Sequence, residues 1–423
     1  MAGPDRAADG WQPPERPEWV ERLNEEGRCM DIRAVIPLDE DSLIDAAILS
    51  NGELSDFGPG GWREPFSVFV RSLDEEADLN LTGRLRVRSE IIQILSARLQ
   101  IEEAYRLHPE IEEEEISQPI IVLGQGRSGT SFLVNLLDAH PDNGSVRHWE
   151  ALFPCPPPEA ATYHSDPRIE RAHRLITQKN RITPTLTSMH DFSGYKPIEC
   201  CVVIALNFMS PTWLAANFGQ VPSFEKYLAT QDIDRALLYH RRVLKLLQWR
   251  NPRQHWVLKD VLYLDWASTL YRLYPDALFV WPHRDAVRAL ASARNMIGVQ
   301  QWAHSDHPFK NASLDVMLDP HVSAARLLAA VDYLDSGAIP AGQIHHMLYR
   351  DLIADPLGSV ERMYAHFGLP LTPDARAAMQ RYLADNPRDA RPPHRFAAGS
   401  DEEVAAARAA YQPYLDRFDI PVE

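Results

Sequence analysis

The residues of this chain whose types and spacing could do chemistry lie in the stretch GQGRSGTS, residues 124–131. Four apolar residues, 120–123, precede it, and Phe and Leu recur at helical spacing over residues 132–137. Strand, Gly-rich turn and helix in this order bring backbone N–H groups and the positive end of a helix dipole to one point. The loop adds the cation of Arg127 and the hydroxyls of Ser128, Thr130 and Ser131. This combination predicts a phosphate-binding site.

Three loop patterns compete for these residues. The glycines satisfy the G-x-G-x-x-G dinucleotide pattern, but residues 142–149 make a poor second parallel strand. The loop of nucleotide triphosphatases also fits, except that Thr130 stands where its lysine belongs. The third pattern, G-x-x-[RK]-[ST]-G-T-[ST], is similar to the 5′-phosphosulfate loop of sulfotransferases and matches at every specified position. The third pattern is favoured, and its predicted binding residues are Gly126, Arg127, Ser128, Gly129, Thr130 and Ser131.

A second group of polar residues follows strand ends further along the chain. Residues 256–258 and 277–281 read as strands, with a helix over about 262–274 between them and another helix after the second. Residues 344–349 read as a further strand. Apolar strands that alternate with amphipathic helices predict a parallel sheet covered on both faces. Lys259, Arg284 and Asp285 fall just after strands, at the edge where open α/β sheets bind ligands.

Several segments occur in one order that resembles the bacterial sulfotransferase family of the third type, over about residues 50–423. The order of the loop, a glutamate, Lys-Asp and Arg…Ser is also similar to protein-tyrosine sulfotransferases. The segments are WEALFPCPP (149–157), DPRI (166–169), PIEC (197–200), LKLLQW (244–249), LK (258–259), HRD (283–285) and YRDLIADP (349–356). The resemblance implies an α/β fold of the P-loop nucleotide hydrolase type, with a parallel central sheet flanked by helices. It also implies phosphoadenylyl sulfate (PAPS) as donor, 3′-phosphoadenosine 5′-phosphate (PAP) as product, and no metal.

The same resemblance assigns expected roles to single residues. Arg284 and Ser292, eight positions apart, would grip the 3′-phosphate that separates PAPS from ATP. Lys259 would neutralise the leaving 5′-phosphate. Glu150 ranks first as the general base for an acceptor hydroxyl, and His190 ranks second. The prediction is sulfuryl transfer from PAPS to a hydroxyl, rather than an amine, of a small-molecule, glycan or lipid acceptor.

The chain departs from the family pattern in three places. Gln125 and Gly126 stand where Pro commonly precedes the Arg, Ala286 replaces the Pro of R-D-P, and Tyr263 stands at the position of the family's histidine. Two alternatives therefore stay open: a P-loop small-molecule kinase, and a PAPS- or PAP-binding protein that has lost catalysis. Protection by PAP rather than by ATP with Mg²⁺ would separate the first from a sulfotransferase.

The composition and charge of the chain limit the kinds of molecule that it is expected to bind. The formal net charge is −16, which disfavours nucleic acid and anionic membranes as partners. It also means that local positive groups must capture an anionic donor, which gives more weight to Arg127, Lys259 and Arg284. No signal peptide or membrane-spanning run is visible, and the four cysteines lack metal-ligand spacing. We expect a cytoplasmic protein without a metal site, for which a homo-oligomer is compatible with the sequence.

The expected organisation has three parts. Residues 1–18 are polar and Pro-rich and are expected to be disordered. Residues 19–115 read as a helical extension without a chemical motif, and residues 116–423 as the sulfotransferase P-loop-like domain. At 423 residues, of which 45% are hydrophobic, the chain can bury a large core.

Overall fold

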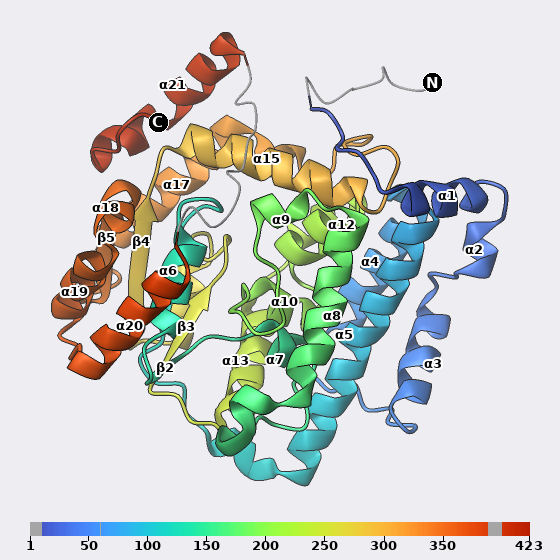
Figure 1. Cartoon of the computed structure of the whole chain (residues 1–423), viewed down its shortest axis with the longest axis horizontal. Helices are drawn as coiled ribbons and strands as arrows, with labels where there is room; N and C mark the ends of the chain where they lie inside the picture. Colours follow the sequence, from blue (N-terminus) through green and yellow to red (C-terminus); the bar gives the residue numbers. More distant parts are fainter. Residues whose placement is uncertain (1–10, 60, 388–399) are drawn as a thin grey trace.

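The computed structural model describes residues 11–59, 61–387 and 400–423. Five parallel strands form one sheet in the order β2-β3-β1-β4-β5 (Figure 1). The strands are β1 (Ile120–Val122), β2 (Asn143–Gly144), β3 (His255–Lys259), β4 (Leu278–His283) and β5 (Ile344–Leu348). Helices flank this sheet, and the predicted fold class is confirmed.

Helices make up most of the remaining structure. They are α1 (Glu18–Gly27), α2 (Ile32–Val35), α3 (Glu40–Ser50), α4 (Arg63–Glu76), α5 (Leu81–Leu107), η1 (Pro109–Glu113), α6 (Thr130–Asp138), α7 (His148–Leu152), η2 (Ala160–Ser165), α8 (Pro167–Ile182), α9 (Leu186–Met189), α10 (Cys201–Ile204), η3 (Ala205–Asn207), η4 (Pro211–Ala215), α11 (Ala216–Phe218), α12 (Pro222–Leu228), α13 (Asp234–Gln248), α14 (Ala267–Leu273), α15 (Ala286–Trp302), α16 (Asp315–Leu318), α17 (Pro320–Asp335), η5 (Ala341–Gln343), α18 (Tyr349–Ala354), α19 (Pro356–Phe367), α20 (Pro373–Asp385) and α21 (Asp401–Arg417).

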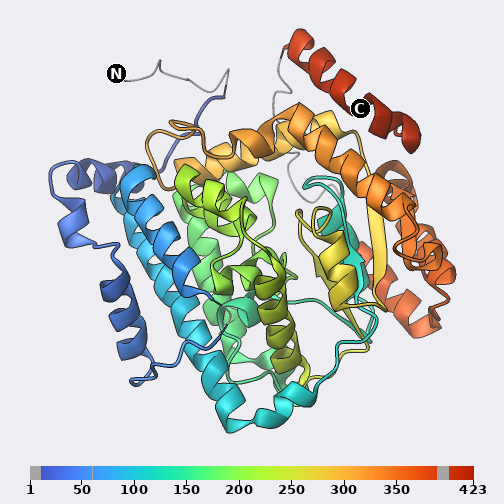
Figure 2. The same ribbon diagram turned by 180° about the vertical axis from the view of Figure 1, so that it is seen from behind.

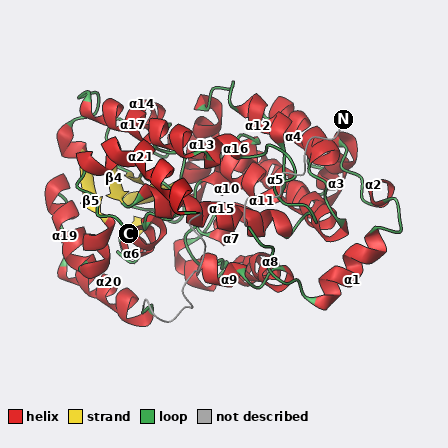
Figure 3. Ribbon diagram, turned by 90° about the horizontal axis from the view of Figure 1, so that it is seen from above, coloured by secondary structure: helices red, strands yellow, loops and turns green. Residues whose placement is uncertain are grey.

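The central strand β1 shows why the sheet must be covered on both faces. All its residues are buried, and successive side chains of a strand point to opposite faces. Ile120 and Val122 pack in one core with apolar residues of α6, α19 and α20. Ile121 packs in the other, larger core, together with residues of α5, α10 and α13. Figure 3 shows the strands enclosed by helices, with α6, α19 and α20 grouped at this end of the molecule.

The N-terminal helices share the larger core. Phe66 and Phe69 of α4 pack on Phe208, which follows η3, and Phe69 also packs on Phe224 of α12. Arg98 of α5, fully buried, donates to the carbonyl oxygens of Phe57, Pro59 and Leu206. Figures 1 and 2 show this layer, drawn in blue, on the far side of the molecule from β5. The helical part is therefore present as expected, and apolar packing joins it to the rest.

Residues 11–17 lie against the molecule. Arg16, which is 8% exposed, donates to the carbonyl oxygens of Trp302 and Ser305 and pairs with Asp306 at 2.6 Å. Trp11 donates through its indole nitrogen to Asn295. This placement differs from the disordered segment expected over residues 1–18, of which residues 1–10 lie outside the described residues.

Helix α21 packs beside the ligand edge of the sheet. It contacts α15 and α17, and Figure 1 shows it in red next to them. The hydroxyl of Tyr414 lies 2.8 Å from Nδ1 of His283, the last residue of β4. Arg408 pairs with Asp285 at 3.0 Å. These contacts hold α21 against the end of β4, so the residues that follow α21 also lie near that strand end.

Candidate active site

The loop between β1 and α6 has the backbone conformation of an anion-binding turn. Gly124 and Gly129 have φ values of +130° and +90°, and Arg127 adopts φ +72°. A Cβ at Gly129 would lie 2.6 Å from Cδ2 of Tyr349, so that glycine is required by space as well as by φ. The hydroxyl of Ser128 donates to the carbonyl oxygen of Gln125 at 2.7 Å and closes the turn. The loop N–H groups and the N-terminus of α6 are thereby held at the end of β1.

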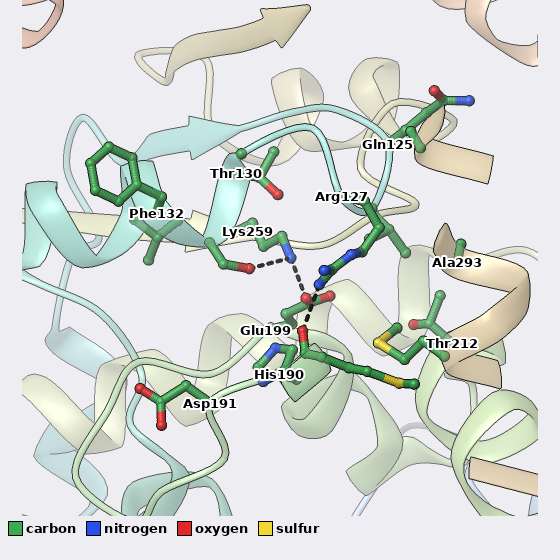
Figure 4. A pocket seen from close by; sticks show the side chains of 18 of the residues that line it. Gln125, Arg127, Thr130, Phe132, His190, Asp191, Glu199, Thr212, Lys259 and Ala293 are labelled. Atoms are coloured by element: carbon green, nitrogen blue, oxygen red, sulfur yellow. Dashed lines mark hydrogen bonds and ion pairs between the residues drawn. The ribbon is translucent and has the colours of Figure 1, made fainter. Parts of the chain in front are cut away.

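Lys259 reaches this loop because its strand neighbours β1. The register pairs Val122 with Lys259, so both strands end at the same level. Its ammonium lies 3.5 Å from the hydroxyl of Ser131 and forms an ion pair with Glu199 (Figure 4). A backbone hydrogen bond of 2.7 Å, from the N–H of Cys200 to the carbonyl of Lys259, ties residue 199 to the strand end.

Arg284 brings a third cation from the end of β4. Its Nη1 donates to the carbonyl oxygen of Arg127 at 2.8 Å, and its guanidinium carbon lies 4.2 Å from the ring centre of Tyr349. The carboxylate of Glu423 pairs with the other side of the guanidinium at 2.6 Å. Ser292, in α15, accepts from Nε of Arg127 at 3.0 Å. The predicted partners Arg284 and Ser292 therefore both lie at the loop, each already hydrogen-bonded within the protein.

The cations at this edge favour an anion. Burial and the nearby charge of Arg284 lower the pKa of Arg127 below its ordinary value. A phosphate bound between the two guanidiniums would offset that repulsion. Glu423 supplies a carboxylate at Arg284, and it also donates its backbone N–H to Asp285 at 3.0 Å.

Glu150 lies away from these groups. It is fully buried at the start of α7, where it accepts from the backbone N–H of Arg147 at 2.8 Å and faces Arg253 at 3.5 Å. Burial raises its pKa against the pull of Arg253. It does not line the cavity described below. This geometry counts against the expected role of Glu150 as general base and fits the cap of a short helix.

His190 does face the cavity. Its ring stacks on Phe192 with 4.3 Å between ring centres, and its Nδ1 has no hydrogen-bond partner among the described residues. Burial lowers the pKa of His190 to about 4, so that its ring is neutral at neutral pH. Figure 4 shows His190 beside Glu199, on the side of the cavity opposite the loop.

Glu199 is the acid that the sequence analysis left without a role. Burial raises its pKa, but the charge and hydrogen bond of Lys259, together with other nearby basic groups, outweigh burial, and the pKa lies below the ordinary value. The signal that could have found it is its position in PIEC (197–200), a segment named above for its resemblance alone. Predicting the contact with Lys259 needed the course of the chain from α7 to α10.

These groups line one cavity of about 740 Å³. Of the predicted loop residues, Gly126, Arg127, Gly129, Thr130 and Ser131 line it, as do Lys259, Arg284 and His190. Ser128 and Ser292 lie behind the lining, each bonded to a loop residue. Away from the loop the walls are mainly apolar, with Met189, Phe192, Trp213, Leu290, Met296 and Ile297 among them. One end therefore suits phosphate groups and the other suits an apolar molecule.

Two further features bear on the site. Over the described ranges, no group of three or more His, Cys, Asp or Glu side chains could hold a metal ion. In the same part of the chain, no single helix is long and apolar enough to cross a membrane; one sharply bent pair, Cys201–Asn207 with Pro211–Phe218, passes by length and composition.

The fold and the site define the class of the protein. A Gly-rich loop from strand to helix, with cations converging at the ligand edge of a parallel sheet, characterises an α/β protein that binds phosphate groups. Residues 119–374 match the sulfotransferase family, and the chain belongs to it.

Relatives within this family include enzymes and solved structures from mycobacteria. The omega-hydroxy-beta-dihydromenaquinone-9 sulfotransferases Stf3 of Mycobacterium bovis and Mycobacterium tuberculosis are each 24% identical over 275 residues, 63% of this chain and 67% of theirs. The structure of sulfotransferase STF1 from M. tuberculosis is similar with a TM-score of 0.73 and 29% identity, over 89% of this chain and 98% of that one. Sulfotransferase STF9 from Mycobacterium avium gives a TM-score of 0.75 and 27% identity, over 90% and 97%.

Proposed function

We propose that the protein transfers the sulfuryl group of PAPS to a hydroxyl of an apolar acceptor and releases PAP. The observation that carries this proposal is the two-part cavity: the loop, Lys259 and Arg284 lie at one end, and apolar walls form the other. The Stf3 relatives are named for a hydroxyl-bearing lipid, which supports an apolar alcohol as the acceptor.

The residues present fit the donor. The N–H groups and hydroxyls of the loop would hold the 5′-phosphosulfate, and Arg284 with Ser292 would hold the 3′-phosphate. The fit rests on the loop residues Gly126, Thr130 and Ser131, which line the cavity, and on the mutual repulsion of Arg127 and Arg284, which a bound phosphate would offset. The donor supplies an activated sulfuryl group, so the protein's tasks are to orient it and to stabilise charge on the leaving side.

Glu199 is the base that the geometry favours. As the acceptor oxygen bonds to sulfur, its proton would pass to the Glu199 carboxylate, and the sulfur–oxygen bond to the 5′-phosphate would break. The electron pair of that bond stays on the phosphate oxygen, where the Lys259 ammonium can stabilise it. Once Lys259 turns to the phosphate, Glu199 loses part of the charge that lowers its pKa and becomes a stronger base.

Donor dependence tests the proposal. PAP should raise the melting temperature strongly, adenosine 5′-phosphosulfate, which lacks the 3′-phosphate, should raise it less, and ATP with Mg²⁺ least. Labelled PAPS should transfer its sulfuryl group to apolar alcohols. Stronger protection by ATP with Mg²⁺ would support the kinase alternative, and PAP binding without turnover on any acceptor would support lost catalysis.

Three glutamine substitutions test the base. Glu199→Gln should lower turnover by about 10²-fold or more while PAP affinity is kept. Glu102→Gln is the control, because Glu102 is also paired with a cation, Arg242 at 3.3 Å, but is buried in the N-terminal layer. If Glu150→Gln abolishes turnover and Glu199→Gln does not, the base is Glu150 after all.

A further inference from the structure

Two carboxamide side chains interrupt the apolar part of the cavity. Asn217 belongs to α11 and Gln300 to α15, two helices in contact with each other. Both residues line the cavity, yet they are 2% and 6% exposed, respectively. Neither amide nitrogen donates a hydrogen bond within the described residues, and neither is completely enclosed by protein. Buried amides are normally hydrogen-bonded, so donors left over at a cavity wall indicate a missing partner.

A buried lysine sets the orientation of Asn217. The side-chain oxygen of Asn217 accepts a hydrogen bond from Nζ of Lys179, which is 6% exposed and comes from α8. An ammonium has only donors, so the amide oxygen must face it and the NH₂ group must turn the other way. Burial lowers the pKa of Lys179 to about 7, and the neutral amine also keeps N–H donors. The amide hydrogens are therefore presented to the cavity.

We propose that Asn217, oriented by Lys179 and assisted by Gln300, recognises an oxygen on the acceptor remote from the hydroxyl that is sulfated. This inference rests on the proposed function and narrows its acceptor to a class. The molecule carries a hydroxyl at the Glu199 end, an apolar middle, and a hydrogen-bond-accepting oxygen such as a carbonyl or ether at the Asn217 end. A role confined to holding Lys179 accounts for the Asn217 oxygen but leaves the amide hydrogens at the cavity wall unexplained.

Matched pairs of probes test this selectivity. Methyl esters of ω-hydroxy fatty acids with 10 to 16 carbons are compared with 1-alkanols of the same length, each by thermal shift and titration of the PAP-bound protein. The best ester should bind about 2- to 10-fold more tightly than its alkanol, the gain from one neutral hydrogen bond. Thermal stabilisation by PAP alone is measured before any probe is added. If PAP does not stabilise the protein, that result counts against the proposed function and not against the acceptor selectivity.

Asn217→Asp is the informative variant. The aspartate has the same shape and still pairs with Lys179, but it offers the cavity an acceptor in place of a donor. The ester preference should vanish, while PAP binding should be unchanged because the side chain of Asn217 is bonded to Lys179 and not to a loop residue. Asn24→Asp is the matched control: Asn24 is also 2% exposed, and its side-chain oxygen also accepts, from the N–H of Thr82 at 3.1 Å, outside the cavity.

Two results would overturn the inference. One is that no methyl ester binds more tightly than the alkanol of the same length, including the case in which neither series binds. The other is an ester preference that survives in Asn217→Asp. Lys179→Met gives an independent check, because it frees the amide to turn: the preference should shrink there even though Asn217 itself is intact.

Discussion

At the scale of the residue, Arg284 has the most informative surroundings. Its guanidinium is stacked on Tyr349, bonded to the carbonyl of Arg127, and paired with Glu423, so its direction is set before any ligand arrives. The Glu423 carboxylate and the neighbouring charges act against burial and raise the pKa of Arg284 above its ordinary value. A cation held in this way can discriminate ligands by where they carry charge.

Arg284→Ala should weaken PAP binding by about 10- to 100-fold, because a hydrogen bond to a charged group contributes about 1.5–3 kcal/mol. Affinity for adenosine 5′-phosphosulfate should hardly change, since that ligand lacks the 3′-phosphate. Isothermal titration with both ligands measures the difference. Arg272→Ala, which breaks an exposed pair with Asp234, serves as the control. Equal losses for both ligands would show that Arg284 does not contact the 3′-phosphate.

The positions of site residues could be predicted from the sequence where a strand end fixes them, and could not where long-range contacts do. Lys259 is the last residue of β3 and Arg284 directly follows β4. Parallel strands end at one edge of a sheet, so the convergence of both residues on the loop followed from the order of elements. No such rule governs Glu150 and Glu199. Which of them reaches the cavity depends on long-range contacts, such as the hydrogen bond of 2.8 Å from the N–H of Ile198 to the carbonyl of Val146.

At the scale of the element, strands were predicted more closely than helices. The expected strand over residues 277–281 is observed at Leu278–His283, because its apolar run is long and bounded by turns. The helix expected over 262–274 begins only at Ala267. Asp260 accepts from the N–H of Leu262 at 2.9 Å, and this bond holds the chain in a turn after β3. Such a local side-chain hydrogen bond competes with helix formation. The spacing of apolar residues does not reveal it, so the start of this helix was predicted too early.

The segment after α21 brings Glu423 to Arg284, a contact that only the structure shows. The carboxylate of Glu423 and the 3′-phosphate of the proposed donor would pair with the same guanidinium, so Glu423→Gln should strengthen PAP binding several-fold. Binding of adenosine 5′-phosphosulfate should stay unchanged. Glu402→Gln, on the exposed side of α21, is the control. Weaker PAP binding in Glu423→Gln would show that this carboxylate orients Arg284 for the ligand instead of competing with it.

At the scale of the whole molecule, one apolar core joins the N-terminal helices to the segment that faces the cavity. Buried histidines within it make the fold sensitive to acid. His240 of α13 is 1% exposed, neither ring nitrogen has a hydrogen-bond partner among the described residues, and burial lowers its pKa to about 3. Above pH 6.5 it is neutral in both the folded and the unfolded chain. As the pH falls from about 6.5 toward 3, only the unfolded chain takes up the proton, and stability is lost.

This titration predicts a measurable difference at pH 5. His240 should there lower the free energy of unfolding by about 2 kcal/mol relative to pH 7, from 1.4 kcal/mol per pH unit below 6.5. Denaturant unfolding of His240→Leu should show a pH dependence smaller by that amount between pH 7 and pH 5. His321→Gln, at an exposed position, should keep the wild-type dependence. An unchanged slope in His240→Leu would mean that another group causes the acid sensitivity.

Tyr349 contacts both parts of the site that would hold the phosphates of the proposed donor, since its ring fills the space beside Gly129 and lies under Arg284. The rigid ring thus fixes the distance between the loop and the guanidinium of Arg284. A fixed distance selects ligands by the separation of their two charged groups and not by the nucleobase that they carry. Nucleotides should therefore be sorted by the geometry of their two phosphates, with a 2′,5′-bisphosphate disfavoured against its 3′,5′ isomer even though both carry the same charge.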